Sequence, residues 1–415
     1  MRTKSLLLSN LISLLLLQGG LYLLPLIIVP YQVRVIGVEY FGVIALARSI
    51  SAYIGVFVDY GFNYVGARKV AVYKDDKNRL NEIFMSVLYS KMLLAIIGLL
   101  VIFCVSLLIP NLREYYWVYL ISYLYVIGQA LFPNWFYMGI EKNKNITVII
   151  LIARIVFVVC VFVFIRKPED FYKIPLFNSV TMVLAGAISL QMIFNHFDFK
   201  IKSINILDIR ENLKEGSGYY ITNMASSSYS FLAPFFLGVF YGNSVVGYYS
   251  GGEKIILAFK NLIHPIGYAI NPIQARIYKQ SKRNGLQYLK NKTIMFGLIM
   301  LVMCFLLMIY ADKVVFVVLG ENFDGSVVWV KMLSFVPFLA LISNLLGYHG
   351  LYYVGYKKYL TYYYVLAAII AFVFMLILMG YNAYFAVSIS VLFYEFSIVL
   401  FVVFVFVYVL KNRAY

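Results

Sequence analysis

Charged side chains occur inside apolar segments of this sequence that are long enough to cross a lipid bilayer. A charge at the middle of a membrane costs roughly 2.5–3.5 kcal/mol, so such a side chain normally faces a helix bundle or a water-filled cavity. Cations in that position can bind an anionic headgroup through charge-assisted hydrogen bonds. Four residues have this placement and are our candidates for a cationic substrate-binding cavity: Arg48, Arg154, Lys254 and Lys260.

A second group of polar residues in these segments is suited to binding a coupling ion, H+ or Na+, or to lining the cavity. Its members are Asp59, Glu253, His264, Asn271 and Glu395. Structural alternatives remain open for two of them. Asp59 lies near the expected cytoplasmic end of its segment, where it could cap the helix or pair with Arg68. Glu395 could pair with a cation instead of carrying a proton.

One face of the expected helix 245–273 carries a polar stripe. At 100° per residue, four side chains fall within about 20° of one line along this helix: Glu253, Lys260, His264 and Asn271. The stripe is the wall of a central aqueous cavity or a ladder of ion pairs that holds helices together. Lys91 and Lys331, by contrast, lie nearer to helix ends, where long side chains reach the membrane interface.

The composition is that of a polytopic membrane protein. Of 415 residues, 63% are hydrophobic and 13% are charged, and the mean hydropathy is +0.85. Apolar runs long enough to span roughly 30 Å of hydrocarbon recur from end to end and leave no room for an extramembrane enzyme domain. We predict an all-α integral membrane protein with about twelve transmembrane helices at 10–33, 41–62, 84–109, 115–138, 146–166, 172–194, 217–241, 245–273, 293–312, 327–354, 360–379 and 384–410.

Lysine and arginine alternate between the connections of these helices. The connections on the side of the N-terminus, together with the two tails, hold 23 of the 35 cations, and the connections on the other side hold six. Because cytoplasmic loops carry the excess of positive charge, both termini are expected in the cytoplasm. The net charge of +17 therefore reflects topology, and nucleic-acid binding is not expected.

An internal repeat appears at an offset of 205 residues. Gly37 then matches Gly242 and Gly42 matches Gly247, while Arg48 lies over Glu253. Transporters are often built from two related halves. We therefore predict two pseudo-symmetric six-helix lobes around a central cavity, at 1–195 and 217–415, joined by a cytoplasmic linker at 196–216 that forms an amphipathic helix.

The three cysteines give no sign of a metal site or a disulfide. Cys104, Cys160 and Cys304 all fall inside apolar spans, without metal-ligand spacing or histidine partners. We read them as small core residues and expect no metal and no cofactor.

The N-terminal part of the chain resembles the opening of the bacterial O-antigen flippases (Wzx type), polysaccharide transporters of the multidrug/oligosaccharidyl-lipid/polysaccharide exporter superfamily. The resemblance covers about 50 residues within 23–71. The matching positions are Pro30, Tyr31, Arg34, Val35, Gly37, Phe41, Gly42, the segment DYGFN at 59–63 and Arg68.

This resemblance implies a function and partners. The family moves an undecaprenyl-diphosphate-linked oligosaccharide, the repeat unit of a surface polysaccharide, across the bacterial inner membrane by alternating access between two lobes. It also implies an association with the polysaccharide polymerase and the chain-length machinery. A hydrophilic, anionic headgroup of this kind requires a wet, cation-lined cavity, which the buried cations could supply.

Two other functions remain open. A MATE-like, cation-coupled exporter of small molecules would prefer an acidic cavity, whereas the central buried set holds four cations and three acids. A membrane glycosyltransferase or polymerase would need catalytic groups on a sizeable external loop. The acids of GENFDG, residues 320–325, lie in a short one.

Overall fold

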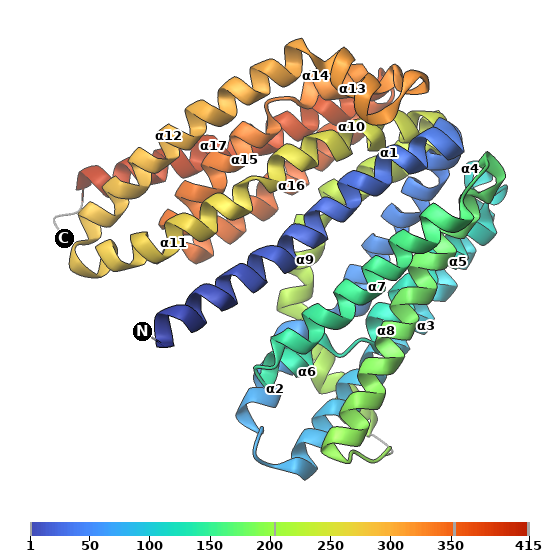
Figure 1. Ribbon diagram of the computed structural model, residues 1–415, viewed down its shortest axis with the longest axis vertical. Helices are drawn as coiled ribbons and strands as arrows, with labels where there is room; N and C mark the ends of the chain where they lie inside the picture. Colours follow the sequence, from blue (N-terminus) through green and yellow to red (C-terminus); the bar gives the residue numbers. More distant parts are fainter. Residues whose placement is uncertain (1, 203–204, 352–353, 413–415) are drawn as a thin grey trace. The chain divides into compact units, whose positions relative to one another are not determined.

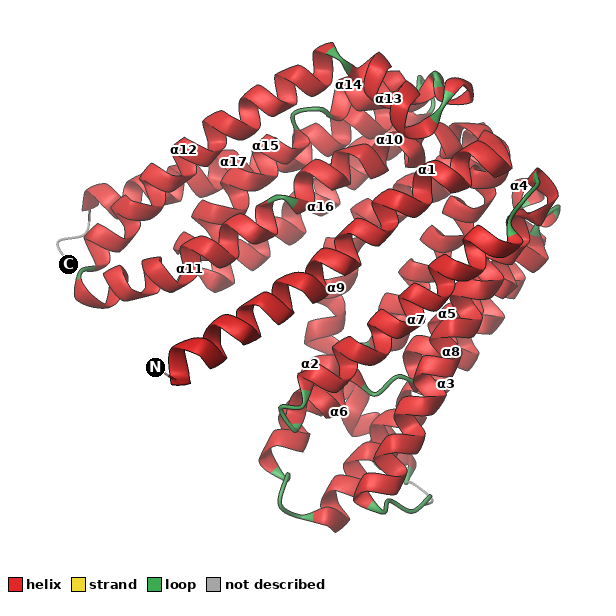
Figure 2. Ribbon diagram, viewed as in Figure 1, coloured by secondary structure: helices red, strands yellow, loops and turns green. Residues whose placement is uncertain are grey.

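The computed structural model describes residues 2–202, 205–351 and 354–412, with side chains outside the description at 2–26, 143–145, 222, 225–230, 268, 272 and 412. In these ranges the secondary structure consists of helices joined by loops, and they contain no strand (Figure 2). Packing contacts divide the chain into two compact units, unit 1 at Met1–Gly247 and unit 2 at Tyr248–Tyr415.

Unit 1 is a bundle in which α5 packs against α8, α3 and α1, and α7 packs against α8 (Figure 1). Its elements, in chain order, are α1 (Arg2–Asp59), α2 (Phe62–Val72), α3 (Lys77–Leu108), α4 (Pro110–Arg113), α5 (Tyr116–Leu131), α6 (Asn134–Gly139), α7 (Asn143–Phe164), η1 (Pro168–Tyr172), α8 (Lys173–Phe197) and α9 (Ile206–Tyr241). The next helix, α10 (Asn243–Asn261), crosses the boundary between the units.

Unit 2 is a second bundle, in which α16 packs along α17 and α11 packs against α12 (Figure 1). Its elements after α10 are α11 (Ile263–Gln280), α12 (Lys282–Ile309), α13 (Ala311–Leu319), η2 (Glu321–Phe323), α14 (Gly325–Leu333), α15 (Val336–Ile342), the π-helix η3 (Ser343–Leu351), α16 (Lys357–Met379) and α17 (Ala383–Asn412).

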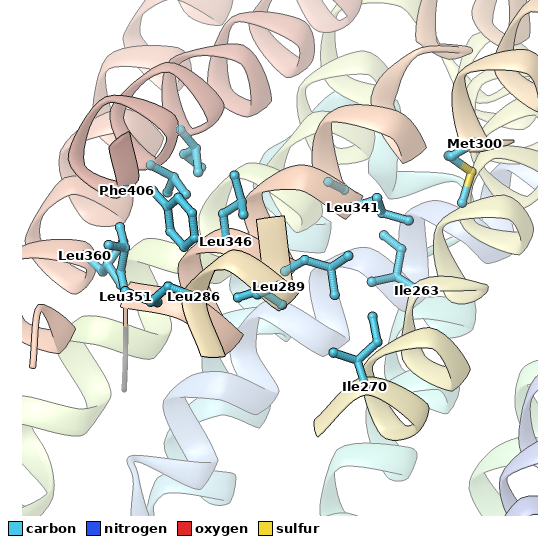
Figure 3. Close-up of a cluster of buried hydrophobic side chains, with 14 of the residues drawn as sticks. Ile263, Ile270, Leu286, Leu289, Met300, Leu341, Leu346, Leu351, Leu360 and Phe406 are labelled. Atoms are coloured by element: carbon cyan, nitrogen blue, oxygen red, sulfur yellow. The ribbon is translucent and has the colours of Figure 1, made fainter. Parts of the chain in front are cut away.

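An apolar core joins the helices of unit 2. Leu286 and Leu289 of α12, Leu351 of η3, Leu360 of α16 and Phe406 of α17 are all buried in one cluster (Figure 3). Each buried side chain of this size contributes roughly 1.5–3 kcal/mol relative to exposure in water. The start of α12, the start of α16 and the end of α17 are thereby fixed at the same end of unit 2.

The two predicted turns of the internal repeat have the same backbone conformation. Gly37 interrupts α1 with φ +77° and ψ 175°, and Gly242 follows α9 with φ +85° and ψ 176°. This region is open to glycine and strained for residues with a Cβ. The matched dihedral angles support the repeat, and they explain why α1 contains two predicted spans.

The second matched pair of glycines marks a close approach of the two turns. A Cβ on Gly42 would overlap the carbonyl oxygen of Asn243, and a Cβ on Gly247 would overlap that of Val38. Each turn therefore packs its backbone against the other. No side chain fits between them.

The structure describes eight helices that are long and apolar enough to cross a membrane: Ile27–Val72, Lys77–Leu108, Ile146–Phe164, Pro168–Phe197, Lys282–Ile309, Gly325–Leu351, Lys357–Met379 and Ala383–Lys411. The chain is thus a multi-pass membrane protein. The count of twelve and the cytoplasmic termini stay predictions. Predicted span 115–138 is broken before Pro133, and predicted span 245–273 is broken at Leu262.

The predicted linker is partly helical. Residues 206–216 form the first turns of α9, which continues to Tyr241. The packing boundary after Gly247 groups α9 with unit 1, whereas the sequence repeat groups it with the second half. Packing and repeat are different criteria, so the predicted lobes 1–195 and 217–415 stay a prediction.

The close approach at the matched turns gives a stability prediction. We expect Gly42→Ala to lower the melting temperature of the detergent-solubilised protein, because its methyl group would displace the Asn243 backbone. Overpacking of this kind costs about 1–3 kcal/mol. The control is Gly380→Ala, where a Cβ meets nothing within 4 Å. Equal melting temperatures for the two variants would show that the turns do not pack as described.

Candidate functional site

Arg154 of α7 is the cation around which unit 1 builds a polar site. Its Nη2 donates to the hydroxyl oxygen of Tyr125 at 3.2 Å, and its Nη1 donates to Oδ1 of Asn178 at 3.4 Å. The guanidinium carbon lies 5.9 Å from the centre of the Tyr125 ring, within range of a cation–π contact. All three residues are half-buried.

The tight contact between α5 and α8 positions these two partners. Gly128, one turn after Tyr125, would place a Cβ 2.7 Å from the backbone of Met182, which lies one turn after Asn178. The two helices can therefore approach backbone to backbone, and this brings the phenol and the amide to the same guanidinium.

The hydrogen-bond partners of Arg154 do not neutralise its positive charge. Both are neutral oxygens, and no carboxylate forms an ion pair with Arg154 among the residues that the structure describes. A guanidinium cannot lose its proton in a protein, so desolvation cannot neutralise it. The site therefore carries a full positive charge held in fixed geometry.

Arg48 lies on the accessible face of α1. Its neighbours Leu46 and Ala47 are fully buried, and the hydroxyl of Ser49 donates to the carbonyl oxygen of Phe231 in α9, whereas Arg48 itself is exposed. α1 thus buries one face against α9 and presents Arg48 on another, and the cavity role of Arg48 stays a prediction.

The face of α1 that carries Arg48 leads to α5. At Gly55, seven residues and about 10 Å further along, an added Cβ would lie 3.7 Å from Val126 and 3.8 Å from the Oε1 atom of Gln129. Arg48 and the Arg154–Tyr125 pair thus belong to helices that pack within the same unit.

Asp59 has a different partner from the one considered in the sequence. Its carboxylate pairs with Lys91 of α3 at 3.1 Å and accepts two hydrogen bonds from Asn63, at 2.9 and 3.0 Å. The Lys91 side chain is only 4% exposed, so the prediction that it reaches the interface is wrong. Arg68 pairs instead with Glu215, at 2.9 Å.

In unit 2 the structure joins two of the predicted residues. Lys260 of α10 lies with its Nζ atom 2.7 Å from Oε1 of Glu395 in α17, whose side chain is 6% exposed. At this distance the carboxylate offsets the ammonium charge. Lys260, one residue of the predicted stripe, therefore forms an ion pair. This is the alternative in which the stripe holds helices together.

The other predicted residues of unit 2 lie along α10 and α11. Glu253 is half-buried and accepts a hydrogen bond of 3.5 Å from Tyr249, while Lys254 is half-buried on the same helix. His264 is exposed, and Asn271 is half-buried with a buried Oδ1 atom that has no hydrogen-bond partner among the residues whose side chains the structure describes. Among the predicted residues of unit 2, the contact with a described partner residue of the same set is the ion pair between Lys260 and Glu395.

Sequence reasoning missed a buried polar contact next to the stripe. Gln274, 1% exposed, donates from Nε2 to the carbonyl oxygen of His349 at 2.6 Å. The His349 ring packs over Gly267, where a Cβ would lie 2.9 Å from Nε2. Gln274 could have been found by extending the stripe past Asn271, whereas nothing in the sequence predicts the π-helix that carries His349.

The pairing of Asp59 gives a second prediction. Asp59→Asn should destabilise the protein by about 3–5 kcal/mol, because it leaves the buried Lys91 ammonium without a counter-charge. The double variant Asp59→Asn/Lys91→Gln removes both charges and should recover most of the lost melting temperature.

The same pair of variants separates structural from functional roles for Asp59. Recovery of both stability and activity in the double variant is the result expected of a structural ion pair. Recovery of stability alone, with activity still lost, would contradict a purely structural role.

Comparison with known proteins gives three findings about the sequence. A family model described as "Polysaccharide biosynthesis protein" matches residues 7–278. A protein of Escherichia coli (strain K12) named "Putative O-antigen transporter" is 28% identical over 84% of this chain and 84% of its own length. A protein of the same name from Shigella dysenteriae is 28% identical over 95% of this chain and 98% of its own length.

Solved structures share the fold. An inward-facing multidrug resistance MATE family transporter of the MOP superfamily aligns with a TM-score of 0.66 over 94% of this chain and 96% of that one, at 14% identity. A MOP superfamily transporter from Pyrococcus furiosus aligns with a TM-score of 0.53 over 96% of this chain and 93% of that one, at 16% identity. At these identities the likeness establishes the fold.

Proposed function

Because this chain belongs to the polysaccharide biosynthesis protein family, we propose that it moves a lipid-linked oligosaccharide across the bacterial inner membrane. The transport role is supported by relatives that are named putative O-antigen transporters and by the transporter fold. The proposed substrate is an undecaprenyl-diphosphate-linked repeat unit of a surface polysaccharide. The polymerase and chain-length machinery would then use the translocated unit.

The observation that carries this proposal is the uncompensated charge of Arg154. A diphosphate-sugar headgroup is anionic and rich in hydroxyl groups, so it needs a fixed cation and polar neighbours in place of water. Arg154 supplies the cation, while Tyr125 and Asn178 hold its guanidinium and present polar atoms beside it. A planar guanidinium can also bind two phosphate oxygens at once.

The candidate cations of the two units differ in how their charge is balanced. Arg154 is balanced by neutral groups alone, whereas Lys260 shares its charge with Glu395. We therefore assign the main headgroup contact to Arg154, with Arg48 as a second accessible cation. Lys260 becomes available to substrate when Glu395 is protonated or binds another cation.

The pairing of Lys260 with Glu395 would couple transport to an ion. Protonation or Na+ binding at Glu395 would release Lys260, and alternating access would carry the loaded site from one leaflet to the other. Glu253 is the second group suited to this role, since it is half-buried and held by Tyr249.

The charge of the site also separates this function from drug export on the same fold. An exporter of cationic drugs needs acids free to bind the drug, but Asp59 and Glu395 are each paired with a lysine. Arg154 would repel a cationic drug. An anionic, lipid-linked substrate fits both observations.

The test removes the charge of Arg154 and keeps its hydrogen-bonding capacity. Arg154→Gln should reduce surface polysaccharide about tenfold to a hundredfold, because a hydrogen bond to a charged group contributes about 1.5–3 kcal/mol. Arg154→Lys should retain part of the activity. The measurements are polysaccharide display in a strain that lacks the native gene and the accumulation of lipid-linked repeat units, both at matched protein levels.

The matched control is Arg166→Gln. Arg166 is exposed in the connection before η1, and its guanidinium donates to the carbonyl oxygen of Val163. Normal display in Arg154→Gln, or an equal loss in both variants, would contradict the assignment of Arg154 to substrate binding.

A further inference from the structure

One end of unit 2 gathers positive charge without carboxylates. Two segments that meet at this end, residues 254–311 and 325–394, contain no aspartate or glutamate. α11 ends here, α12 and α16 begin here and α17 ends here, held together by the buried cluster of Leu286, Leu289, Leu351, Leu360 and Phe406 (Figure 3). We call six of the exposed cations at this place the basic end: Arg276, Lys279, Arg283, Lys290, Lys358 and Lys411.

The cations of the basic end have no carboxylate partner in the described part of the chain. The two ion pairs described in unit 2 are Lys260–Glu395 and Lys331–Asp312, and neither includes a residue of the basic end. The helices α12 and α16, which begin at this end, are each long and apolar enough to cross a membrane. The unbalanced charge therefore lies where the membrane-spanning segments stop.

Unit 1 treats comparable cations differently. Lys69 pairs with Glu215 at 3.1 Å, and Lys77 pairs with Asp198 at 3.1 Å. The hydrogen bond from Lys77 holds the pKa of the Asp198 carboxyl below its usual range, as expected when an ammonium stabilises the ionised form. Cations near helix ends can therefore have carboxylate partners in this protein. The basic end differs from these two sites of unit 1, because its cations have no carboxylate partner among the described residues.

Aromatic side chains accompany the basic end. Tyr359 and Tyr362 at the start of α16 are 65% and 73% exposed, and Lys292 lies 5.7 Å from the ring centre of Tyr288. Tyrosine concentrates at the membrane–water interface, where its ring contacts lipid and its hydroxyl contacts the headgroups. Exposed tyrosines and unbalanced cations at the ends of spans match the headgroup layer of a lipid leaflet.

We propose that the basic end is a binding surface for anionic phospholipid headgroups. Clusters of four to eight Lys and Arg next to membrane spans bind anionic lipids, and the basic end meets that description with six. Phosphate oxygens would receive hydrogen bonds from Arg276, Lys279 and Arg283 at the α11–α12 turn, while Lys358 and Lys411 extend the surface across α16 and α17. This surface shares no residue with the cationic site of unit 1.

The experiment measures lipid retention by native mass spectrometry of the purified, full-length protein. Phosphatidylglycerol or cardiolipin is titrated against phosphatidylcholine in nonionic detergent. The test variant is Lys279→Gln/Arg283→Gln/Lys358→Gln. Its matched control is Lys74→Gln/Lys167→Gln/Lys200→Gln, which removes three exposed cations of unit 1. Monodisperse elution and unchanged melting temperature in both variants confirm that they are folded.

The proposal predicts that the two variants differ clearly in their affinity for anionic phospholipids. Each cation near an anionic surface strengthens binding roughly fivefold, so the test variant should lose affinity for phosphatidylglycerol and cardiolipin by about a hundredfold. The control should keep nearly all of it, and high salt should weaken binding to the unaltered protein. Equal lipid affinity of the two variants would overturn the proposal. So would equal affinity of the unaltered protein for phosphatidylcholine, which would instead favour an acidic protein as the partner.

Discussion

The cost of holding charge away from water is the constraint on which the rest of this structure depends. A membrane-spanning chain can place an ionised group at depth only beside a counter-charge, polar partners or water. The protein uses the first solution for Lys91 and for Lys260, which pair with Asp59 and Glu395. It uses neutral partners for Arg154. This difference separates the charges that stabilise the bundle from the charge that is available to a substrate.

Backbone packing makes both solutions geometrically possible. Gly128 lets α5 and α8 approach closely enough for Tyr125 and Asn178 to reach one guanidinium. Gly42 and Gly247 likewise let the two matched turns touch without intervening side chains. Close backbone contact through small residues is the usual way in which membrane helices associate, because lipid supplies no hydrophobic drive between them. The site therefore depends on glycines that carry no chemistry of their own.

The sequence predicts the local features of this molecule well and its long-range pairs poorly. Hydropathy and glycine spacing predicted the helices and the matched turns at Gly37 and Gly242, since both depend on neighbours in the chain. The partner of Asp59 is 32 residues away and that of Lys260 is 135 residues away. Such pairs are decided by how helices rotate and pack. The same reason explains why the Gln274–His349 contact was missed.

The central claim is that an uncompensated positive charge lies in a water-accessible site of unit 1. It is tested most directly by placing a cysteine beside Arg154, as Asn178→Cys, in a background where Cys104, Cys160 and Cys304 are serine. The rates of modification by anionic and cationic thiosulfonate reagents of similar size are then compared. The account predicts several-fold faster reaction with the anionic reagent and loss of that preference when Arg154→Gln is added. Equal rates with both reagents while Arg154 is present, or no reaction with either, would contradict it.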